Sequence, residues 1–148
     1  MSKYYQGRFA PKNPQKYKGD PTKIIARSSW EFKFMIFADS HPDIIEWASE
    51  EIAIPYLSPV DNRIHRYFPD VWIKKRDKAG KIKTIMIEIK PLAQTIEPVK
   101  KTKINKRYIQ EVYNWGINTA KWEAAKKYCD KRGWDFEILT ERELNIKV

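Results

Sequence analysis

The order of hydrophobic and polar positions predicts a helix near the start of the chain. Ser28 and Glu31 have the spacing of an N-terminal capping box, in which a serine and a glutamate three residues later satisfy free amides of a helix start. Apolar residues then dominate from Trp30 to Ala38. The pair His41-Pro42 disfavours helical backbone, so we expect the helix to begin after Ser28 and to end before His41.

Apolar segments in the middle of the chain predict strands. They are rich in isoleucine and aromatic residues, and turn-forming residues such as those at 59–62 separate them. Residues 78–81 predict a hairpin turn, so the two strands beside it should pair with each other. The segments are 44–47 and 52–56, which form one long bent strand or two short ones, then 66–74 and 82–90.

Helical spacing returns after Pro91, which ends the last of these strands. Apolar residues recur three and four positions apart in two groups, and Gly116 and Asn118 lie between the groups. We therefore expect one long kinked helix or two helices. The groups are Tyr108, Val112 and Trp115, followed by Trp122, Ala125 and Cys129.

The last part of the chain predicts a strand and a short helix. Gly133 suits the C-terminal cap of the preceding helix, and residues 134–139 have the composition of a strand. Thr140 and Glu143 repeat the capping-box pattern and predict a short final helix. The expected order of elements is helix, two or three strands, helix and strand.

Length and composition fit one domain with a basic arm. The chain has 148 residues, of which 42% are hydrophobic and 14% aromatic, enough for one core. Residues 1–22 are basic, contain three prolines and lack a helical or strand period. We expect an extended N-terminal arm over 1–22 and a single domain over 23–148. The aromatic residues of the arm either strap it over the core or leave it to follow a phosphate backbone or a partner protein.

Charge and residue counts exclude several classes of function. The 29 Lys and Arg against 19 Asp and Glu give a net charge of +10, which favours a polyanionic partner such as nucleic acid. One cysteine and two histidines cannot build an internal disulfide, a zinc finger or a His-rich metal site. The five glycines are scattered, so no phosphate-binding loop is present. We expect no membrane span and no small-molecule cofactor.

Two carboxylates and a lysine are predicted to meet on the central pair of strands. Side chains alternate along a strand, so Glu88 and Lys90 share a charged face, and strand pairing can bring Asp70 beside Glu88. Neighbouring carboxylates repel unless a cation lies between them, and Mg²⁺ prefers such oxygen ligands. We predict a site for Mg²⁺, or Mn²⁺, in which Lys90 holds an attacking water or stabilises the transition state of phosphodiester hydrolysis.

Each part of this pattern also has a purely structural interpretation. Charged residues on strands more often form a solvated face or cross-strand ion pairs. Pro69 directly before Asp70, the apolar lead into Glu88 and the order of elements favour a catalytic site. Glu31 either serves only the helix cap or brings a third carboxylate to the metal, and its spacing gives these two roles similar weight.

The motifs resemble those of the PD-(D/E)XK nuclease superfamily. Pro69-Asp70 is similar to its first motif and Glu88-Ile89-Lys90 to its second. The resemblance implies an α/β (α+β) restriction-endonuclease-like core of order αβββαβ, with a mixed sheet flanked by helices, and a metal-dependent deoxyribonuclease activity. The residues that it implies for the site are Asp70, Glu88, Lys90 and Glu31 for catalysis, with Asp70, Glu88, Glu31 and the backbone carbonyl of Ile89 as metal ligands.

A closer resemblance covers nearly the whole chain, including the arm. Stretches such as 16–21, 27–31, 66–70 and 118–122 resemble the head-completion nucleases of T-even-like tailed phages. This resemblance implies a nuclease that acts late in head assembly, in the host cytoplasm or on the virion, and trims packaged DNA before a tail joins. The implied partners are double-stranded DNA and phage head, portal or neck proteins.

Other functions stay open at this point. A head protein could keep the fold and grip DNA at the portal without cutting it, and an endonuclease of transposition or repair could share the motifs. One detail departs from the superfamily, some of whose branches carry a Gln-x-x-x-Tyr pair after the second motif. Gln110 and Tyr113 are one residue closer than that, so we give Gln110 no catalytic role and expect Tyr113 and Trp115 in the core.

Positive charge concentrates in three places that we expect to contact phosphates. They are the arm, the tip of the predicted hairpin, and the basic connector, residues 100–107, before the second helical region. None contains a base-reading motif, so we predict little sequence specificity and steep salt dependence. The candidates are Lys74, Lys75 and Arg76 at the tip, Lys100, Lys101, Lys103, Lys106 and Arg107 in the basic connector, and also Arg27 and Arg66.

Overall fold

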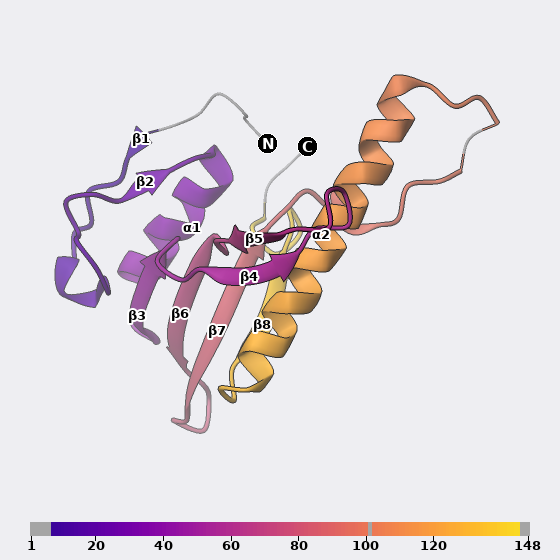
Figure 1. Ribbon diagram of the computed structural model, residues 1–148. Coiled ribbons are helices and arrows are strands. Elements are labelled where there is room, and N and C mark those ends of the chain that lie inside the picture. Colours follow the sequence, from indigo (N-terminus) through magenta and orange to yellow (C-terminus); the bar gives the residue numbers. More distant parts are fainter. Residues whose placement is uncertain (1–6, 101, 146–148) are drawn as a thin grey trace.

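A four-stranded mixed sheet forms the centre of the structure, a computed structural model that describes residues 7–100 and 102–145 (Figure 1). Neighbours among β3, β6 and β7 are antiparallel, whereas β8 pairs parallel with β7 after the chain returns through a long helix. In spatial order the strands are β3 Ile44–Ser49, β6 Val71–Arg76, β7 Ile82–Ile89 and β8 Asp135–Leu139. The predicted αβββαβ core with a mixed sheet and flanking helices is confirmed.

Helix α1 spans Ser29–Ser40 and begins where the capping box predicted it. The Ser28 hydroxyl accepts a hydrogen bond from the backbone N–H of Glu31 at 3.1 Å. His41 caps the other end, directly before Pro42. The helix packs against β3, an outer strand of the sheet, and carries Glu31 in its first turn.

Helix α2 spans Lys106–Asp130 as a single helix. The side chain of Asn105 caps it by accepting a hydrogen bond from the Tyr108 N–H at 2.8 Å. Its second half packs against β8 and buries the predicted group Trp122, Ala125 and Cys129. Across the described residues, no helix is both long enough and apolar enough to cross a bilayer.

The first half of α2 projects beyond the sheet (Figure 1). Tyr113 is 53% exposed, so its expected place in the core is wrong. Trp115 is half-buried and packs edge-on against Trp122, with ring centroids 6.1 Å apart. Val112, a member of the predicted apolar group, is 42% exposed, so the spacing that predicted this half of the helix does not correspond to a fully buried face.

The predicted single strand over 66–74 is wrong, because the chain breaks at residues 68–70. β5, Ile64–Tyr67, pairs with β4, Ile54–Leu57, as a separate hairpin, and β6 begins only at Val71. Pro69 lies in the break and has no N–H to continue a strand ladder. The break places Asp70 at the start of β6, at one end of the central sheet.

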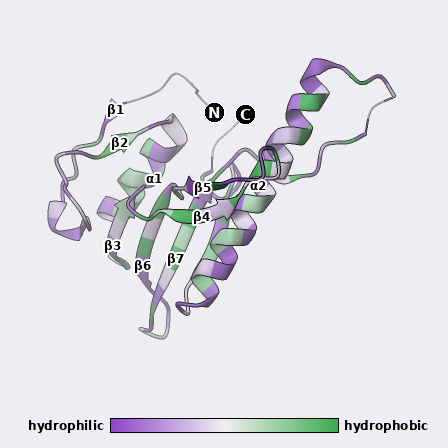
Figure 2. Ribbon diagram, viewed as in Figure 1, coloured by the Kyte–Doolittle hydropathy of each residue, from purple (hydrophilic) through white to green (hydrophobic). Residues whose placement is uncertain are grey.

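Strand β7 is buried on both of its faces from residue 85 to residue 89. The predicted division into one core face and one charged face is therefore wrong. Met86 and its cross-strand partner Trp72 fill the face that also carries Glu88. Figure 2 shows hydrophobic residues along β4, β6 and β7. Glu88 is thus a buried charge at the end of an apolar face rather than part of a solvated one.

The N-terminal segment shares the core with the rest of the chain over its described residues. β1, Gly7–Arg8, pairs with β2, Ile25–Ala26, and a 3-10 turn, η1, spans Pro14–Lys16. Phe9 and Tyr17 are buried against Trp47 of β3. Residues 1–6 of the predicted arm lie outside the described residues, and the division at residue 22 stays a prediction.

The segment after α2 follows the prediction except at its end. Gly133 adopts a positive φ of 70° in the turn into β8, which glycine allows at low cost. The capping-box contact also forms, since the Thr140 N–H donates to Glu143 Oε1 at 2.8 Å. Over residues 141–145 the chain nevertheless makes turns, so the predicted short helix is wrong there.

A second 3-10 turn, η2, spans Leu92–Thr95, between β7 and α2.

Candidate active site

Asp70 and Glu88 face each other across the β6–β7 pair. Val71 is the cross-strand partner of Ile87, so Asp70, one residue earlier, stands opposite Glu88. The backbone N–H of Ile89 donates a hydrogen bond of 2.7 Å to Asp70 Oδ2. Glu88 is only 5% exposed. The strand register therefore holds two carboxylates side by side in a largely buried position.

These carboxylates line a pocket of about 320 Å³ at the end of the sheet where β6 begins and β7 ends. The pocket gathers residues from α1, the β5–β6 break, β7 and α2. It brings together all four predicted catalytic residues and Ile89. The complete lining is Glu31, Arg66, Tyr67, Phe68, Asp70, Glu88, Ile89, Lys90 and Lys121.

The surroundings of Asp70 disfavour its negative charge. Burial raises the pKa of the Asp70 carboxyl well above its usual value, and the neighbouring charges of Glu88 and Glu31 raise it further. The Ile89 N–H opposes this by stabilising the carboxylate. A cation beside this group would remove the repulsion that raises the pKa.

Glu31 reaches the pocket from the first turn of α1 and is only 6% exposed. Burial raises the pKa of its carboxyl, and the negative charge of Glu50 raises this pKa further. Its Oε2 lies 3.4 Å from the Ser28 hydroxyl, whereas its Oε1 is buried and has no hydrogen-bond partner among the described residues. Such an orphan oxygen is costly, so a ligand at this position would satisfy it.

The donor set fits a hard divalent cation that keeps part of its water shell. Among the described residues, no group of three or more His, Cys, Asp or Glu side chains is arranged to hold a metal by itself. Mg²⁺ commonly uses only one or two protein carboxylates and fills its other positions with water and substrate phosphate. The paired carboxylates of Asp70 and Glu88, with the orphan oxygen of Glu31 lining the same pocket, suit that pattern.

Lys121 of α2 also lines the pocket, and the sequence interpretation gave it no role. Its ammonium lies 5.6 Å from the ring centre of Tyr67 and 5.8 Å from that of Tyr56. Burial lowers the pKa of Lys121, and the charge of Lys90 lowers it further. The only sequence clue was its position directly before the buried Trp122, at the edge of the helix face that packs on the sheet.

The two arginines predicted to contact phosphates near the carboxylates differ in whether their side chains are already paired with an acidic residue. Arg66 is exposed, lines the pocket and lies over the ring of Phe68 at 5.6 Å. Arg27 instead forms an ion pair with Glu50, with Nε and Oε2 2.7 Å apart. Glu50 adopts a φ of 54°, unusual for a residue other than glycine, and its N–H donates to the carbonyl of Asp70.

The predicted lysine clusters lie in different places. The hairpin tip is at the other end of β6 from Asp70, and its residues Lys74 to Arg76 lie about 13 to 20 Å away at about 3.3 Å per strand residue. Lys74 there lies 3.8 Å from Glu46. The basic connector leads into the start of α2, beyond the sheet, and its described members Lys100, Lys103, Lys106 and Arg107 are exposed (Figure 1). Lys101 lies outside the described residues. Phosphate binding by these residues stays a prediction.

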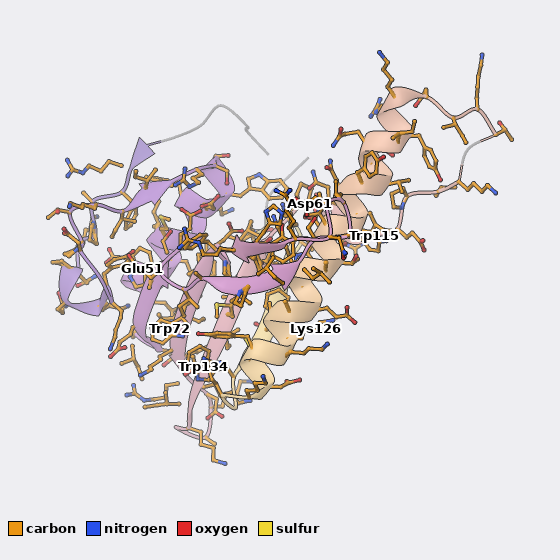
Figure 3. All side chains as sticks on the ribbon, in the orientation of Figure 1. Glu51, Asp61, Trp72, Trp115, Lys126 and Trp134 are labelled. Carbon is orange, nitrogen blue, oxygen red and sulfur yellow. The ribbon has the colours of Figure 1, made fainter. Side chains whose placement is uncertain are left out.

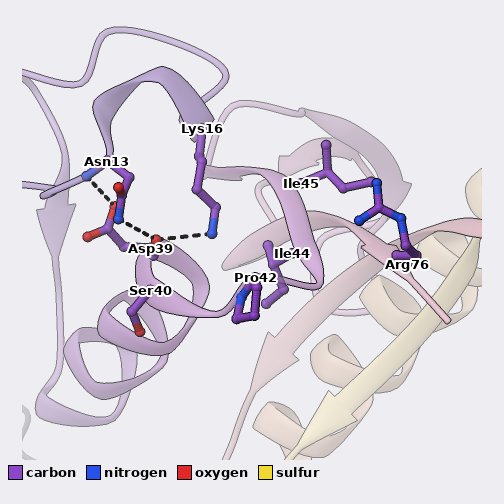
Figure 4. Close-up of a pocket in the computed structure, with 8 residues that line it drawn as sticks. All are labelled: Asn13, Lys16, Asp39, Ser40, Pro42, Ile44, Ile45 and Arg76. Carbon is purple, nitrogen blue, oxygen red and sulfur yellow. Dashed lines mark hydrogen bonds between the residues drawn. The ribbon is translucent and has the colours of Figure 1, made fainter. Parts of the chain in front are cut away.

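Another cavity, of about 370 Å³, lies where α1 meets the start of β3 (Figure 4). The fold uses its polar groups: the Asp39 carboxylate accepts two backbone N–H bonds, and the Lys16 ammonium donates to two carbonyl oxygens. Arg76 of the hairpin tip lines the same cavity. These contacts hold the N-terminal segment against α1, so we assign this cavity a structural role.

Comparison with known proteins identifies relatives of this chain. Residues 41–141 match the family described as TnsA-like endonuclease N terminal. Over 141 residues the chain is 45% identical to the head completion nuclease of Enterobacteria phage T4, which covers 93% of this chain and 91% of that protein. The family match includes Asp70, Glu88 and Lys90, and the resemblance described from the motifs is confirmed.

Proposed function

The chain belongs to the TnsA-like endonuclease family, and on that premise we propose that it is a metal-dependent deoxyribonuclease that hydrolyses phosphodiester bonds. The observation that carries the proposal is the position of Asp70 beside Glu88 across neighbouring strands, with Lys90 and Glu31 lining the same pocket. Phosphodiester hydrolysis requires positive charge at the phosphate and a positioned water. Carboxylates that can bind a cation, in the same pocket as a lysine, can meet both requirements.

The metal ligands in this proposal are Asp70, Glu88 and Glu31, with the backbone carbonyl of Ile89 as a further candidate. Mg²⁺ is the expected ion and Mn²⁺ the alternative. When bound, the ion supplies Lewis acidity and positive charge at the scissile phosphate. The buried oxygen of Glu31 that lacks a partner supports this assignment, as does the raised pKa of Asp70.

The protein's own groups supply positioning. The Ile89 N–H donates to the Asp70 carboxylate, and β7 carries Glu88. Lys90 follows directly after the end of β7, where its backbone N–H donates to the Leu139 carbonyl of β8. Lys90 holds the attacking water or stabilises charge on the phosphate in the transition state. Because both strands belong to the central sheet, these groups keep their spacing without a substrate.

We propose that double-stranded DNA is bound mainly through its phosphates. Arg66 lies at the pocket, and the basic connector extends the positive charge away from it. The net charge of +10 supports a general attraction to DNA. Contacts of this kind read little sequence, so cleavage should show low sequence specificity and binding should weaken steeply with salt.

The biological role proposed is phage head completion. The T4 relative is named a head completion nuclease, and the identity to it extends over nearly the whole of both chains. We propose that the protein trims packaged DNA before the head joins the tail and that it contacts a head, portal or neck protein. It would do so in the cytoplasm of the infected host.

Cleavage assays test the activity. Purified protein is incubated with linear and circular duplex DNA, with Mg²⁺, with Mn²⁺ and with EDTA. Cleavage is expected only with metal, and Lys90→Ala should lose it. Lys126→Ala, which changes an exposed lysine of α2, is the matched control and should cut like the wild type. Equal cleavage by wild type and Lys90→Ala would refute the site, and wild-type protein that binds DNA without cutting it would favour the DNA-gripping alternative.

A further inference from the structure

Lys121 is a half-buried lysine that faces the carboxylate pocket from helix α2. It lies 31 positions after Lys90 in the sequence, yet both residues line the same pocket. The helix places it there because the next residue, Trp122, is buried in the core and fixes the rotation of α2 about its axis. Lys121 therefore has a defined position rather than a free surface one.

Two tyrosine rings hold the Lys121 side chain. Tyr56 of β4 and Tyr67 of β5 are both buried, and their ring centres lie 5.8 Å and 5.6 Å from the ammonium. Cations at these distances from aromatic rings are attracted to the ring faces. The β4–β5 hairpin thus pins a cation of α2 beside the pocket, using one residue from each of its strands.

The ammonium of Lys121 has hydrogen-bonding capacity left over. Within 7–100 and 102–145, no hydrogen bond or ion pair engages it, although Glu88 and Asp70 line the same pocket. An ammonium has three N–H donors, and withdrawing them from water without an acceptor is costly. The pocket also holds Lys90, whose like charge disfavours the charged form of Lys121. An anion bound in the pocket would satisfy both lysines.

We propose that Lys121 is a substrate-binding residue that contacts a DNA phosphate from the α2 side of the pocket. The inference rests on the proposed function in one respect, that this pocket receives DNA. It adds a second positively charged side chain to the site, one that lies on α2 and has a different role from Lys90. Lys90 acts on the reacting group, whereas Lys121 holds the phosphate backbone, with the β4–β5 hairpin keeping it in place.

A purely structural role makes a different prediction. If Lys121 served only to balance the charges of Asp70 and Glu88, its removal would destabilise the fold. If it binds phosphate, its removal leaves stability unchanged or higher and weakens DNA binding. Lys121→Met suits this comparison, because methionine keeps an unbranched side chain between the two tyrosine rings and removes only the charge.

The experiment measures binding of a short fluorescent duplex in EDTA over a range of salt concentrations. For Lys121→Met, Kd should rise about tenfold, the scale of one lost charge-assisted hydrogen bond. The slope of log K against log salt should fall by about 0.9, the value for one lost phosphate contact. Lys121→Arg should recover most of the affinity. Lys126→Met, at an exposed position of the same helix (Figure 3), should match the wild type.

Steady-state cleavage then separates the two lysines. Lys121→Met should raise KM with a smaller change in kcat, whereas Lys90→Met should lower kcat. Unchanged Kd and salt slope in Lys121→Met would overturn the inference, and so would a fall in Tm that Lys121→Arg reverses without any change in DNA affinity. A wild-type protein that binds DNA but does not cut it would refute the proposed nuclease activity. The binding measurements on Lys121→Met would still decide whether Lys121 contacts a DNA phosphate.

Discussion

The three carboxylates of the pocket and the lysines of the basic connector carry opposite charges and are held in different ways. Glu88 and Glu31 are 5% and 6% exposed and belong to β7 and α1, so the sheet and the helix fix their positions. The described residues of the connector are exposed and, apart from a pair between Arg107 and Glu111, its charges lack ion-pair partners there. Neighbouring carboxylates repel each other, so a rigid frame must hold them together. A lysine on an exposed segment can contact a phosphate without such a frame.

This difference makes separate predictions for the two regions. Changes to the pocket carboxylates should act on the rate of cleavage, and the size of the effect should depend on which carboxylate is changed. Changes in the connector should act on affinity and depend on the number of charges removed.

Asp70→Asn should produce the largest loss. Asparagine keeps the size of the side chain but removes the charge that binds a cation, so cleavage should fall about 10³-fold or more. Stability should be unchanged or higher, because the change also removes the repulsion with Glu88. Cleavage rates and Tm measure both effects. Asp61→Asn, at an exposed carboxylate paired with His65, is the control and should cut normally. A loss smaller than tenfold in Asp70→Asn would contradict the site.

Glu31→Gln and Ser28→Ala should separate catalysis from helix capping. The cap uses the Glu31 backbone N–H and the Ser28 hydroxyl, so Ser28→Ala should cost about 1 kcal/mol of stability and leave cleavage nearly intact. Glu31→Gln keeps that N–H but removes the charge, so cleavage should fall roughly 10–100-fold with little loss of stability. Urea unfolding and cleavage rates give the two readouts. If Glu31→Gln changes only stability, the glutamate is a capping residue alone.

Neutralising the connector should weaken binding without slowing catalysis at saturating DNA. The fourfold variant changes Lys100, Lys103, Lys106 and Arg107 to Gln, and the salt slope of DNA binding should fall by about 0.9 for each residue that contacts a phosphate. A second variant that changes Lys74, Lys75 and Arg76 at the hairpin tip to Gln should have a smaller effect for each charge removed, since the tip lies at the opposite end of β6 from the pocket. A larger effect per charge at the tip would place the DNA at the opposite end of the sheet from the pocket.

Tyr17→Phe should have the smallest effect and separate burial from charge. Tyr17 is as buried as the pocket carboxylates but neutral, and burial raises its pKa to about 12. Above about pH 10 the unfolded chain ionises this tyrosine while the folded chain does not, so wild-type stability should fall between about pH 10 and pH 12. Near neutral pH, Tyr17→Phe should lower the free energy of unfolding by about 1 kcal/mol, because it removes the hydrogen bond that the Ser49 N–H donates to the Tyr17 hydroxyl. Its stability should fall less than that of the wild type between about pH 10 and pH 12, because phenylalanine does not ionise. Cleavage at neutral pH should not change.

Local features were the most predictable from the sequence. The start of α1 follows from one side chain, Ser28, that caps its own helix. The β6–β7 hairpin follows from a turn in which the Asp77 carboxylate accepts N–H bonds from Ala79 and Lys81, and Gly80 takes a positive φ of 81°. Strand alternation placed Glu88 and Lys90 on one face. Each of these depends on residues within a few positions of one another.

The errors arose where distant segments compete for the same residues. Residues 66–74 have the composition of one strand, but β4 pairs with the first part and β3 and β7 with the second, so the chain breaks at Pro69. Val112 has the helical spacing of a core residue, but it is 42% exposed because the first half of α2 projects beyond the sheet. The spacing of apolar residues along a helix does not show where the sheet that it packs against ends.

By itself, the sequence determined the motifs, the order of elements and the pairing of Asp70 with Glu88, because strand alternation and turn chemistry act over short distances. Only the tertiary structure decided that Glu31 and Lys121 share their pocket and that Arg27 is paired with Glu50. Those contacts join segments far apart in the chain. They depend on how each helix is rotated and how deeply it is packed, which the whole hydrophobic core sets together.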